Sequence, residues 1–324
     1  MAGSFIFTAK VRFRSKSMNE RPPFNFFDSL PAIAQIILLL LAMVLGLFIG
    51  QLAGLGLAEL SGLGREMLSD PSWKPSDSFE RTIYRSIALV GHLFTFLIPA
   101  LLYARFLIRD HRRSYMQTNN RPQPWQLFYG SFWIIVAFPV AQYLYVLNQG
   151  IPLPKWATSL EDSTNELIQA LLVMETPFEF LFTLFVMALV PAVGEEFIFR
   201  GLIQRFLEKG SQNSHIAILI SATIFSAFHF QFEGFLPRLM LGLMLGYLFF
   251  WTRSLWVPIF VHFIYNGLQV AAAYFAPEAI GEAAENPDLS VETYQLILAL
   301  GLTFLLGYYI RSRSQQLLNP PTNE

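Results

Sequence analysis

The chain has 324 residues, of which 54% are hydrophobic and only 14% charged, and its mean hydropathy is +0.44. Since ordinary soluble chains carry about 25% charged residues, this composition indicates a membrane protein. The net charge of −1 argues against nucleic-acid binding through a basic face, and the absence of cysteine excludes disulfides, thiolate nucleophiles and Cys-ligated zinc.

The N-terminal region predicts a tail followed by an anchor helix. Residues 1–30 are polar and basic, which indicates a cytoplasmic tail, and Met18 is an alternative start. Residues 31–58 carry no charge; this run is longer than the about 7–15 residues of a signal-peptide core and than the about 20 needed to cross a bilayer. Small residues in it should let another helix approach closely; these are Gly46, Gly50, Gly54 and Gly56.

Further apolar runs predict the remaining spans. They are expected at 86–104, 126–147, from 177 into the region of Arg200, and at 216–232, 236–251, 255–275 and 294–310. We expect His92, in the second span, to be a hydrogen-bonded packing residue. The acidic segment before the fourth span contains an apolar stretch, 167–172, that favours an amphipathic helix at the surface.

The predicted fold is an all-α integral membrane protein of about eight transmembrane helices, with a polar catalytic pocket among the later helices. No repeat, low-complexity tract or linker marks a second independent domain. We divide the chain into a cytoplasmic tail (1–30), N-terminal helices and loops (31–176), a catalytic core (177–275), and an acidic loop with the last helix and a C-terminal tail (276–324).

Basic residues predict the orientation, because Lys and Arg concentrate in cytoplasmic segments. With both termini inside, most of the 22 basic residues fall in inner segments, including the loop 109–121. The outer segments then hold only Arg65, Lys74, Arg81, Arg85, Lys155 and Arg238. The expected location is a bacterial plasma membrane with cytoplasmic N and C termini.

Two adjacent carboxylates and an arginine follow the apolar run 180–190. Ionisable residues at bilayer depth usually serve function and face the protein interior. In a helix, Glu196 and Arg200 share a face and can pair, while Glu195 points about 100° away and remains available as a base. The alternative is a structural Glu196–Arg200 pair, with Glu195 at the water interface.

Polar residues recur in two later spans. Phe225 and His229 stand four apart near the end of the fifth, and His262 and Asn266 stand four apart in the seventh, so each pair shares a helix face. Straight, vertical helices would leave the two histidines about 9 Å apart in height. We expect tilt or sunken outer loops to bring them together.

This set of residues suits peptide hydrolysis, which needs a base, a group that orients water, and donors for the developing oxyanion. Glu195 can be the base and His229 can hold the water. His262 and Asn266 can donate to the tetrahedral oxygen. A rival arrangement uses Glu195, His229 and His262 as ligands of a catalytic zinc. A Ser226 nucleophile is less favoured, because serine within a span usually serves packing.

Three motifs resemble the pattern of the CPBP family, which comprises CAAX proteases and bacteriocin-processing enzymes and is also called the Abi family. They read Glu195-Glu196-x-x-x-Arg200, Phe225-x-x-x-His229 and His262-x-x-x-Asn266, within residues 178–275. The resemblance implies an intramembrane endopeptidase whose site opens toward the cytoplasm. It gives Glu195 the role of activating water with the help of His229. His262 and Asn266 would form the oxyanion site, and Glu196 and Arg200 would organise the helix.

The eukaryotic relatives remove the last three residues of prenylated proteins, so the expected partner is a membrane-associated or lipidated peptide or protein. Some bacterial relatives are linked to bacteriocin maturation or self-immunity, which leaves a non-catalytic immunity or scaffold protein as the alternative. A transporter with an ion relay is less favoured, because the first three spans carry few polar residues. The sequence fixes neither the oligomeric state nor any cofactor, with zinc as the one candidate.

Overall fold

The computed structural model describes residues 30–69, 73–108, 112–278 and 291–318. Within them every regular element is helical, which confirms the all-α prediction. The expected N-terminal tail, the possible start at Met18, the middle of the acidic loop 277–292 and the end of the C-terminal tail lie outside the described residues.

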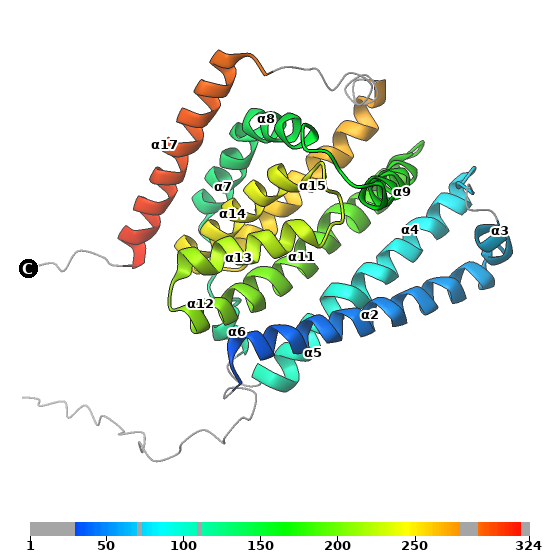
Figure 1. The fold of residues 1–324 in the computed structure, drawn as a ribbon, viewed down its shortest axis with the longest axis horizontal. Helices are drawn as coiled ribbons and strands as arrows, with labels where there is room; N and C mark the ends of the chain where they lie inside the picture. Colours follow the sequence, from blue (N-terminus) through cyan, green and yellow to red (C-terminus); the bar gives the residue numbers. More distant parts are fainter. Residues whose placement is uncertain (1–29, 70–72, 109–111, 279–290, 319–324) are drawn as a thin grey trace, which may run out of the picture.

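Most of the chain forms long apolar helices (Figure 1). In chain order the elements are α2 (Ala32–Leu60), α3 (Gly64–Ser69), α4 (Ser78–His92), η1 (Leu93–Leu97), α5 (Ile98–Tyr103), η2 (Ala104–Ile108), α6 (Arg112–Tyr115), α7 (Pro124–Val136), α8 (Phe138–Gln149), α9 (Lys155–Leu172), α10 (Pro177–Leu184), η4 (Phe185–Leu189), α11 (Val190–Glu196), η5 (Phe197–Gln204), α12 (Arg205–Ser211), α13 (Ser214–Ala227), α14 (Phe235–Thr252), α15 (Trp256–Phe275) and α17 (Thr293–Leu318). The η elements are π-helical turns within longer helices.

Among the described residues, six helices are long and apolar enough to cross a membrane, and a bent pair makes a seventh if it counts as one span. The integral membrane fold is therefore confirmed. The predicted fifth span corresponds to α13, which is apolar but has only 14 residues. The part of the chain that the structure describes thus has six or seven candidate spans against the expected number of about eight, and the predicted fifth span, α13, is the one too short to qualify.

The third span is not the single straight helix expected over 126–147. It consists of α7 and α8, which meet at Ala137 with a bend of 41°. Pro139 lies in the first turn of α8, where its missing N–H and fixed φ favour a new helix start over continuation. This proline explains the break.

The second span begins at Ser78, earlier than the expected residue 86. Arg81 and Arg85, which the sequence assigned to an outer segment, therefore lie within α4 and are buried. Their guanidinium groups donate to Glu179 Oε1 of α10, at 2.6 Å from Arg81 Nε and 3.3 Å from Arg85 Nη1. Burying the arginines requires such a partner, and the ion pairs join α4 to α10.

Glycines of α2 permit the close helix contact that the sequence predicted, with one exception. A Cβ added at Gly46 would lie 1.9 Å from Phe94 O, and one at Gly54 would lie 2.9 Å from Ile87 Cγ2. Gly50 similarly faces the backbone of Gly91. At Gly56 an added Cβ would meet no atom within 4 Å, so that glycine does not serve helix packing.

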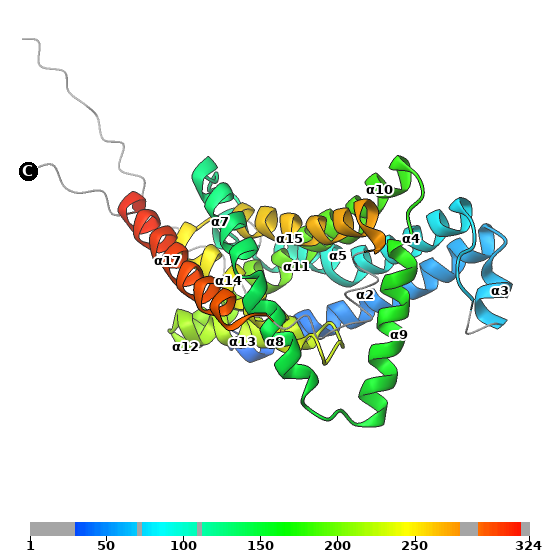
Figure 2. The ribbon, with the colours of Figure 1, turned by 90° about the horizontal axis from the view of Figure 1, so that it is seen from above.

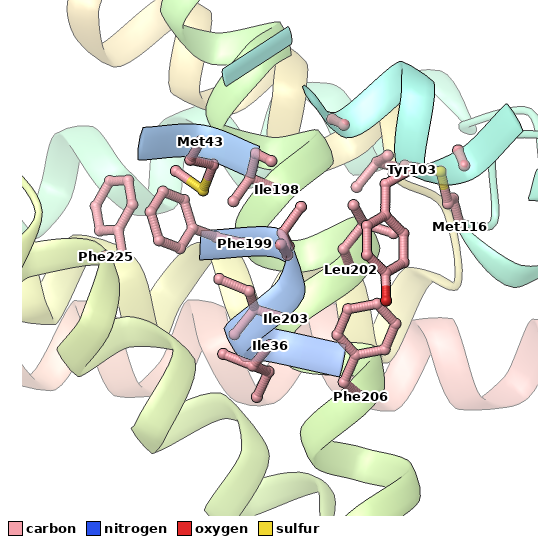
Figure 3. Close-up of a cluster of buried hydrophobic side chains, with 14 of the residues drawn as sticks. Ile36, Met43, Tyr103, Met116, Ile198, Phe199, Leu202, Ile203, Phe206 and Phe225 are labelled. Carbon is pink, nitrogen blue, oxygen red and sulfur yellow. The ribbon is translucent and has the colours of Figure 1, made fainter. Parts of the chain in front are cut away.

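A hydrophobic cluster joins α2 and α5 to the helix that carries the two glutamates (Figure 3). Phe199, Leu202 and Ile203 of η5 are fully buried there against Ile36 and Met43 of α2. Because η5 directly follows the glutamates, this packing fixes how far their helix can rotate or slide.

The predicted surface helix forms as α9. It lies across the other helices rather than along them, so that it is viewed almost along its axis in Figure 1 and along its length in Figure 2. It contacts α4 and α15. This places α9 over the end of the bundle where α4 and α10 begin.

Candidate active site

The two glutamates lie within the longest candidate span, Pro177–Ser211. They end α11, which is flanked by π-helical segments on both sides, η4 and η5. Pro191 in the first turn of α11 offers no N–H to the Met187 carbonyl four residues earlier. Asn266 Nδ2 of α15 donates to that carbonyl at 3.5 Å. Since π turns are frequent at functional sites, the backbone conformation around the two glutamates itself indicates a functional site.

Glu196 and Arg200 form the ion pair that their spacing predicted. Arg200 Nη1 donates to Glu196 Oε1 at 2.7 Å, and both side chains are almost completely buried. Arg200 Nη2 donates to Gly242 O of α14 at 3.0 Å, and its guanidinium lies 4.6 Å from the centre of the Phe225 ring. The pair therefore ties the glutamate helix to α13 and α14.

Glu196 also holds His262, which the sequence did not foresee. His262 Nδ1 lies 2.9 Å from Glu196 Oε1, the same oxygen that accepts from Arg200. A carboxylate can only accept, so Nδ1 carries the proton and Nε2 is directed away from Glu196. His262 is 2% exposed, and its orientation is thus set by a charged neighbour.

His229 lies beyond the end of α13 rather than inside a helix that continues to residue 232. The helix ends at Ala227, and Phe230 has a left-handed φ of 54°. His229 Nδ1 donates to Phe225 O at 2.9 Å, which satisfies a carbonyl freed by the helix end. As with His262, this bond leaves Nε2 as the nitrogen without a proton in the neutral ring.

Glu195 faces both histidines. Its Oε2 lies 3.8 Å from His229 Nε2 and 3.9 Å from His262 Nε2. These separations are too long for direct hydrogen bonds, and Oε2 is buried with no hydrogen-bond partner. Both histidines therefore reach the same carboxylate, with His229 in the turn after the short α13.

Phe225 is the common packing partner of these side chains. Its ring meets His229 edge-on at 5.0 Å and His262 at 5.9 Å between centroids, and it is 1% exposed. Ser226 beside it is equally buried and donates to Phe235 O at 2.7 Å. This contact gives Ser226 a structural role, as the sequence favoured.

His92 has a different environment from the one expected. Its ring stacks on Phe96 at 4.5 Å, but its Nε2 is buried with no hydrogen-bond partner. A Cβ added at Gly194 would lie 3.1 Å from this nitrogen, so His92 packs beside the residue that precedes Glu195. Sequence reasoning missed this neighbour, because no motif residue stands near His92 in the chain.

A cavity of about 500 Å³ contains the reactive groups. Glu195, His229, His262 and Asn266 line it together with His92 and Arg238. Hydrophobic residues of α9 line its other side; these are Ile168, Leu171 and Leu172. The four residues to which the sequence assigned chemistry therefore share one cavity.

The zinc alternative requires three side chains that converge on one point. Among the described residues no group of three His, Asp or Glu side chains is arranged to hold a metal ion. The described residues do not fit a zinc site, and we derive no chemical step through a metal.

The cavity lies at the end of the bundle marked by α9, opposite to α6 and α12 (Figure 1). By the distribution of basic residues, α6 and α12 belong to the inner end and α9 to the outer end. The family resemblance implied a site that opens to the cytoplasm. These two expectations are incompatible for this fold, so at most one of them holds.

Comparison with known proteins places the similarity on the glutamate helix and those that follow it. Residues 177–268 match the type II CAAX prenyl endopeptidase Rce1-like family. A segment of 113 residues, 33% of this chain, is 30% identical to the membrane-embedded CAAX protease MroQ of Staphylococcus aureus (strain USA300). Another of 86 residues, 25% of the chain, is 30% identical to the uncharacterized protein YpbD of Bacillus subtilis (strain 168). These matches span 45% and 41% of the two relatives, and no solved structure matches.

Proposed function

Because residues 177–268 form a Rce1-like CAAX prenyl endopeptidase domain of the CPBP family, we propose that this chain is an intramembrane endopeptidase of the glutamate type. It hydrolyses a peptide bond in a membrane-associated or lipidated substrate that enters the cavity beside α9. The observation that carries the proposal is Glu195 Oε2, a buried carboxylate oxygen without a hydrogen-bond partner that faces two imidazole Nε2 atoms.

The separations around Glu195 suit a shared water molecule. A bridging water lies about 2.8 Å from each partner, and this fits the distances of 3.8 Å and 3.9 Å from Glu195 Oε2 to the two Nε2 atoms. Such a water donates one proton to Glu195 and the other to His229. Both of its lone pairs then remain free, and one of them attacks the carbonyl carbon of the scissile bond.

Attack forms the carbon–oxygen bond and transfers the water proton to Glu195, while the carbonyl electrons move onto the oxygen. Asn266 Nδ2 stabilises that oxyanion as a donor. His262 completes the proposed oxyanion site, and the bond of its Nδ1 to Glu196 orients its ring. Collapse breaks the carbon–nitrogen bond, and the leaving amine takes the proton from Glu195.

Glu196 and Arg200 act on geometry rather than on the substrate. Their ion pair and the bond from Arg200 to Gly242 O hold the glutamate helix against α14.

We place the chain in a bacterial plasma membrane with both termini in the cytoplasm, on the basis of its basic inner segments. In that orientation the cavity opens toward the outer face.

The test is hydrolysis by the purified chain in detergent, with lipidated C-terminal peptides as substrates. The native chain should cleave at least one of them, whereas Glu195→Ala and His229→Ala should not. His215→Ala is the matched control, because His215 is exposed and contacts Tyr247 away from the cavity. If the native chain and both cavity variants are equally inactive on every peptide and equally functional in cells, the chain is a scaffold or immunity protein.

A further inference from the structure

Arg238 is a charged residue of the cavity that the proposed hydrolysis does not use. It lies in the first turn of α14 and lines the cavity together with Glu195 and His229. The buried arginines of the described helices each pair with a glutamate; these are Arg81, Arg85 and Arg200, whereas Arg238 is half-buried. Arg238 forms no ion pair with a described carboxylate, and its hydrogen bonds go to neutral oxygens of Gln231.

The guanidinium is held in position by the turn between α13 and α14. Arg238 Nη1 donates to Gln231 O at 3.1 Å and Nη2 to Gln231 Oε1 at 2.7 Å. Gln231 Nε2 in turn donates to Asn165 Oδ1 of α9 at 2.8 Å. Gly234 provides the space, since a Cβ there would lie 2.6 Å from Arg238 Nη2. The cation is therefore oriented before any ligand arrives, which favours binding.

A guanidinium inside a membrane protein is normally compensated by an anion. The described groups that interact with Arg238 electrostatically are the phenol of Tyr265 and the carboxylates of Glu195 and Glu161. Glu161 is occupied, because its Oε2 accepts from the backbone N–H groups of Phe232 and Glu233. Glu195 is the proposed base. No described carboxylate forms an ion pair with Arg238, so an anion that enters the cavity can form one.

We propose that Arg238 binds a carboxylate of the peptide substrate, supplied either by its free C-terminus or by an acidic side chain near it. The inference rests on the proposed function, and it adds a polar anchor at one end of the cavity. Arginine is suited to this task because its planar fork matches a carboxylate. When the substrate carboxylate binds Arg238, the scissile bond lies on the N-terminal side of that carboxylate in the peptide. It then sits beside Glu195 and the two histidines, which line the same cavity.

The decisive measurement is peptide binding to the full chain carrying Glu195→Gln, which prevents turnover. The probe is a fluorescein-labelled peptide ending in S-farnesyl-Cys-Val-Ile-Met, prepared as the free acid and as the C-terminal amide. A second pair of amidated peptides carries Glu or Gln before the last residue. Fluorescence anisotropy in detergent gives the affinity of each peptide. The measurement is repeated with four further substitutions, each added singly to the Glu195→Gln chain: Arg238→Gln, Arg238→Lys, Gly234→Ala and, at an exposed position, Arg65→Gln.

With Arg238 intact, at least one carboxylate peptide should bind roughly 10- to 100-fold more tightly than its neutral counterpart. The free-acid pair reports on the C-terminus and the Glu/Gln pair on a side chain. Arg238→Gln should abolish that preference and leave the affinity for neutral peptides unchanged. Arg238→Lys and Gly234→Ala should each reduce the preference for the carboxylate peptide, and Arg65→Gln should leave that preference unchanged.

A preference that survives in Arg238→Gln overturns the proposal, as does the absence of any preference or of measurable binding in the parent. Equal loss of affinity for charged and neutral peptides also overturns it, since that result means a purely structural role. Failure of the proposed function is a separate outcome. In that case the chain with Glu195 intact cleaves none of the peptides, while the dependence of binding on Arg238 persists.

Discussion

Glu195 and Glu196 are adjacent in the chain but have opposite surroundings. Glu196 Oε1 accepts from Arg200 at 2.7 Å and from His262 at 2.9 Å, although Glu196 Oε2 has no hydrogen-bond partner. Glu195 Oε2 has no partner either, and it faces two imidazole Nε2 atoms at 3.8 Å and 3.9 Å. The helix turn separates their directions by about 100°. One carboxylate is therefore committed to structure and the other remains reactive, and their substitution should have different effects.

Glu195→Gln should remove activity and keep stability. The amide cannot take a proton from water, and loss of a general base lowers kcat by about 10²- to 10⁴-fold. Because Oε2 of Glu195 has no hydrogen-bond partner to lose, the thermal midpoint in detergent should not fall. Peptide cleavage and thermal unfolding of the same preparation measure both effects. A variant that cleaves at the native rate would show that Glu195 is not the base.

Glu196→Gln should mainly destabilise the fold. It leaves the Arg200 guanidinium buried without its carboxylate, and breaking such a pair costs about 3–5 kcal/mol. Thermal unfolding in detergent should show a clearly lower midpoint than for the native chain. The exposed Glu292→Gln is the control and should behave like the native chain. Equal midpoints for the two variants would contradict the structural role of Glu196.

Two glycines of α2 provide a matched pair for helix packing. Gly46→Ala places a methyl group 1.9 Å from Phe94 O, so α2 must move away from η1 and stability should fall by roughly 1–3 kcal/mol. Gly56→Ala meets no atom within 4 Å, and alanine favours helix by up to about 1 kcal/mol. Unfolding of both variants in detergent tests this contrast. A stable Gly46→Ala protein would mean that α2 packs differently.

Hydrolysis should not depend on a bound metal. The described residues offer no group of three side chains arranged as metal ligands. Prolonged dialysis of an active preparation against a chelator should therefore leave the cleavage rate unchanged. Loss of activity on dialysis and recovery with zinc would favour the arrangement of Glu195, His229 and His262 as ligands instead.

The absence of cysteine makes the orientation easy to measure. Ser159→Cys on α9 and Ser211→Cys at the end of α12 replace exposed serines at opposite ends of the bundle. With cytoplasmic termini, a membrane-impermeant maleimide should label Ser159→Cys in intact cells and Ser211→Cys only after permeabilisation. The reverse pattern would place the cavity at the cytoplasmic face, as the family resemblance implied.

The sequence predicted the features that depend on local pattern. Apolar runs located the spans, and the spacing of Glu196 and Arg200 predicted their ion pair, which the structure confirms. Tertiary features were less accessible. The bond from His262 to Glu196 joins residues 66 positions apart, and α13 ends early, at Ala227, before a left-handed Phe230. Neither feature has a periodic signal in the chain.

Charged residues near the ends of spans misled the prediction in a consistent way. Arg81 and Arg85 were placed outside the second helix because charge normally marks a boundary. In the fold each forms an ion pair with Glu179, which is far away in the sequence.

The environment of His92 was also predicted incorrectly. His92 was expected to be a hydrogen-bonded packing residue, yet its Nε2 has no hydrogen-bond partner and lies beside Gly194. Such partnerships exist only after the helices have assembled.

The π-helical turns around the glutamates have a consequence for how this span tolerates change in its length. A π turn holds one residue more than an α turn, so deleting one residue from η4 or η5 allows that turn to become α-helical. Everything on one side of the deletion then keeps its direction relative to the other side, whereas the same deletion in a regular α-helical turn rotates it by about 100°. A single-codon deletion within η4 should therefore leave Glu195 in line with its partners, while one within the α-helical turns of α10 should rotate Glu195 relative to the start of its span and silence the site.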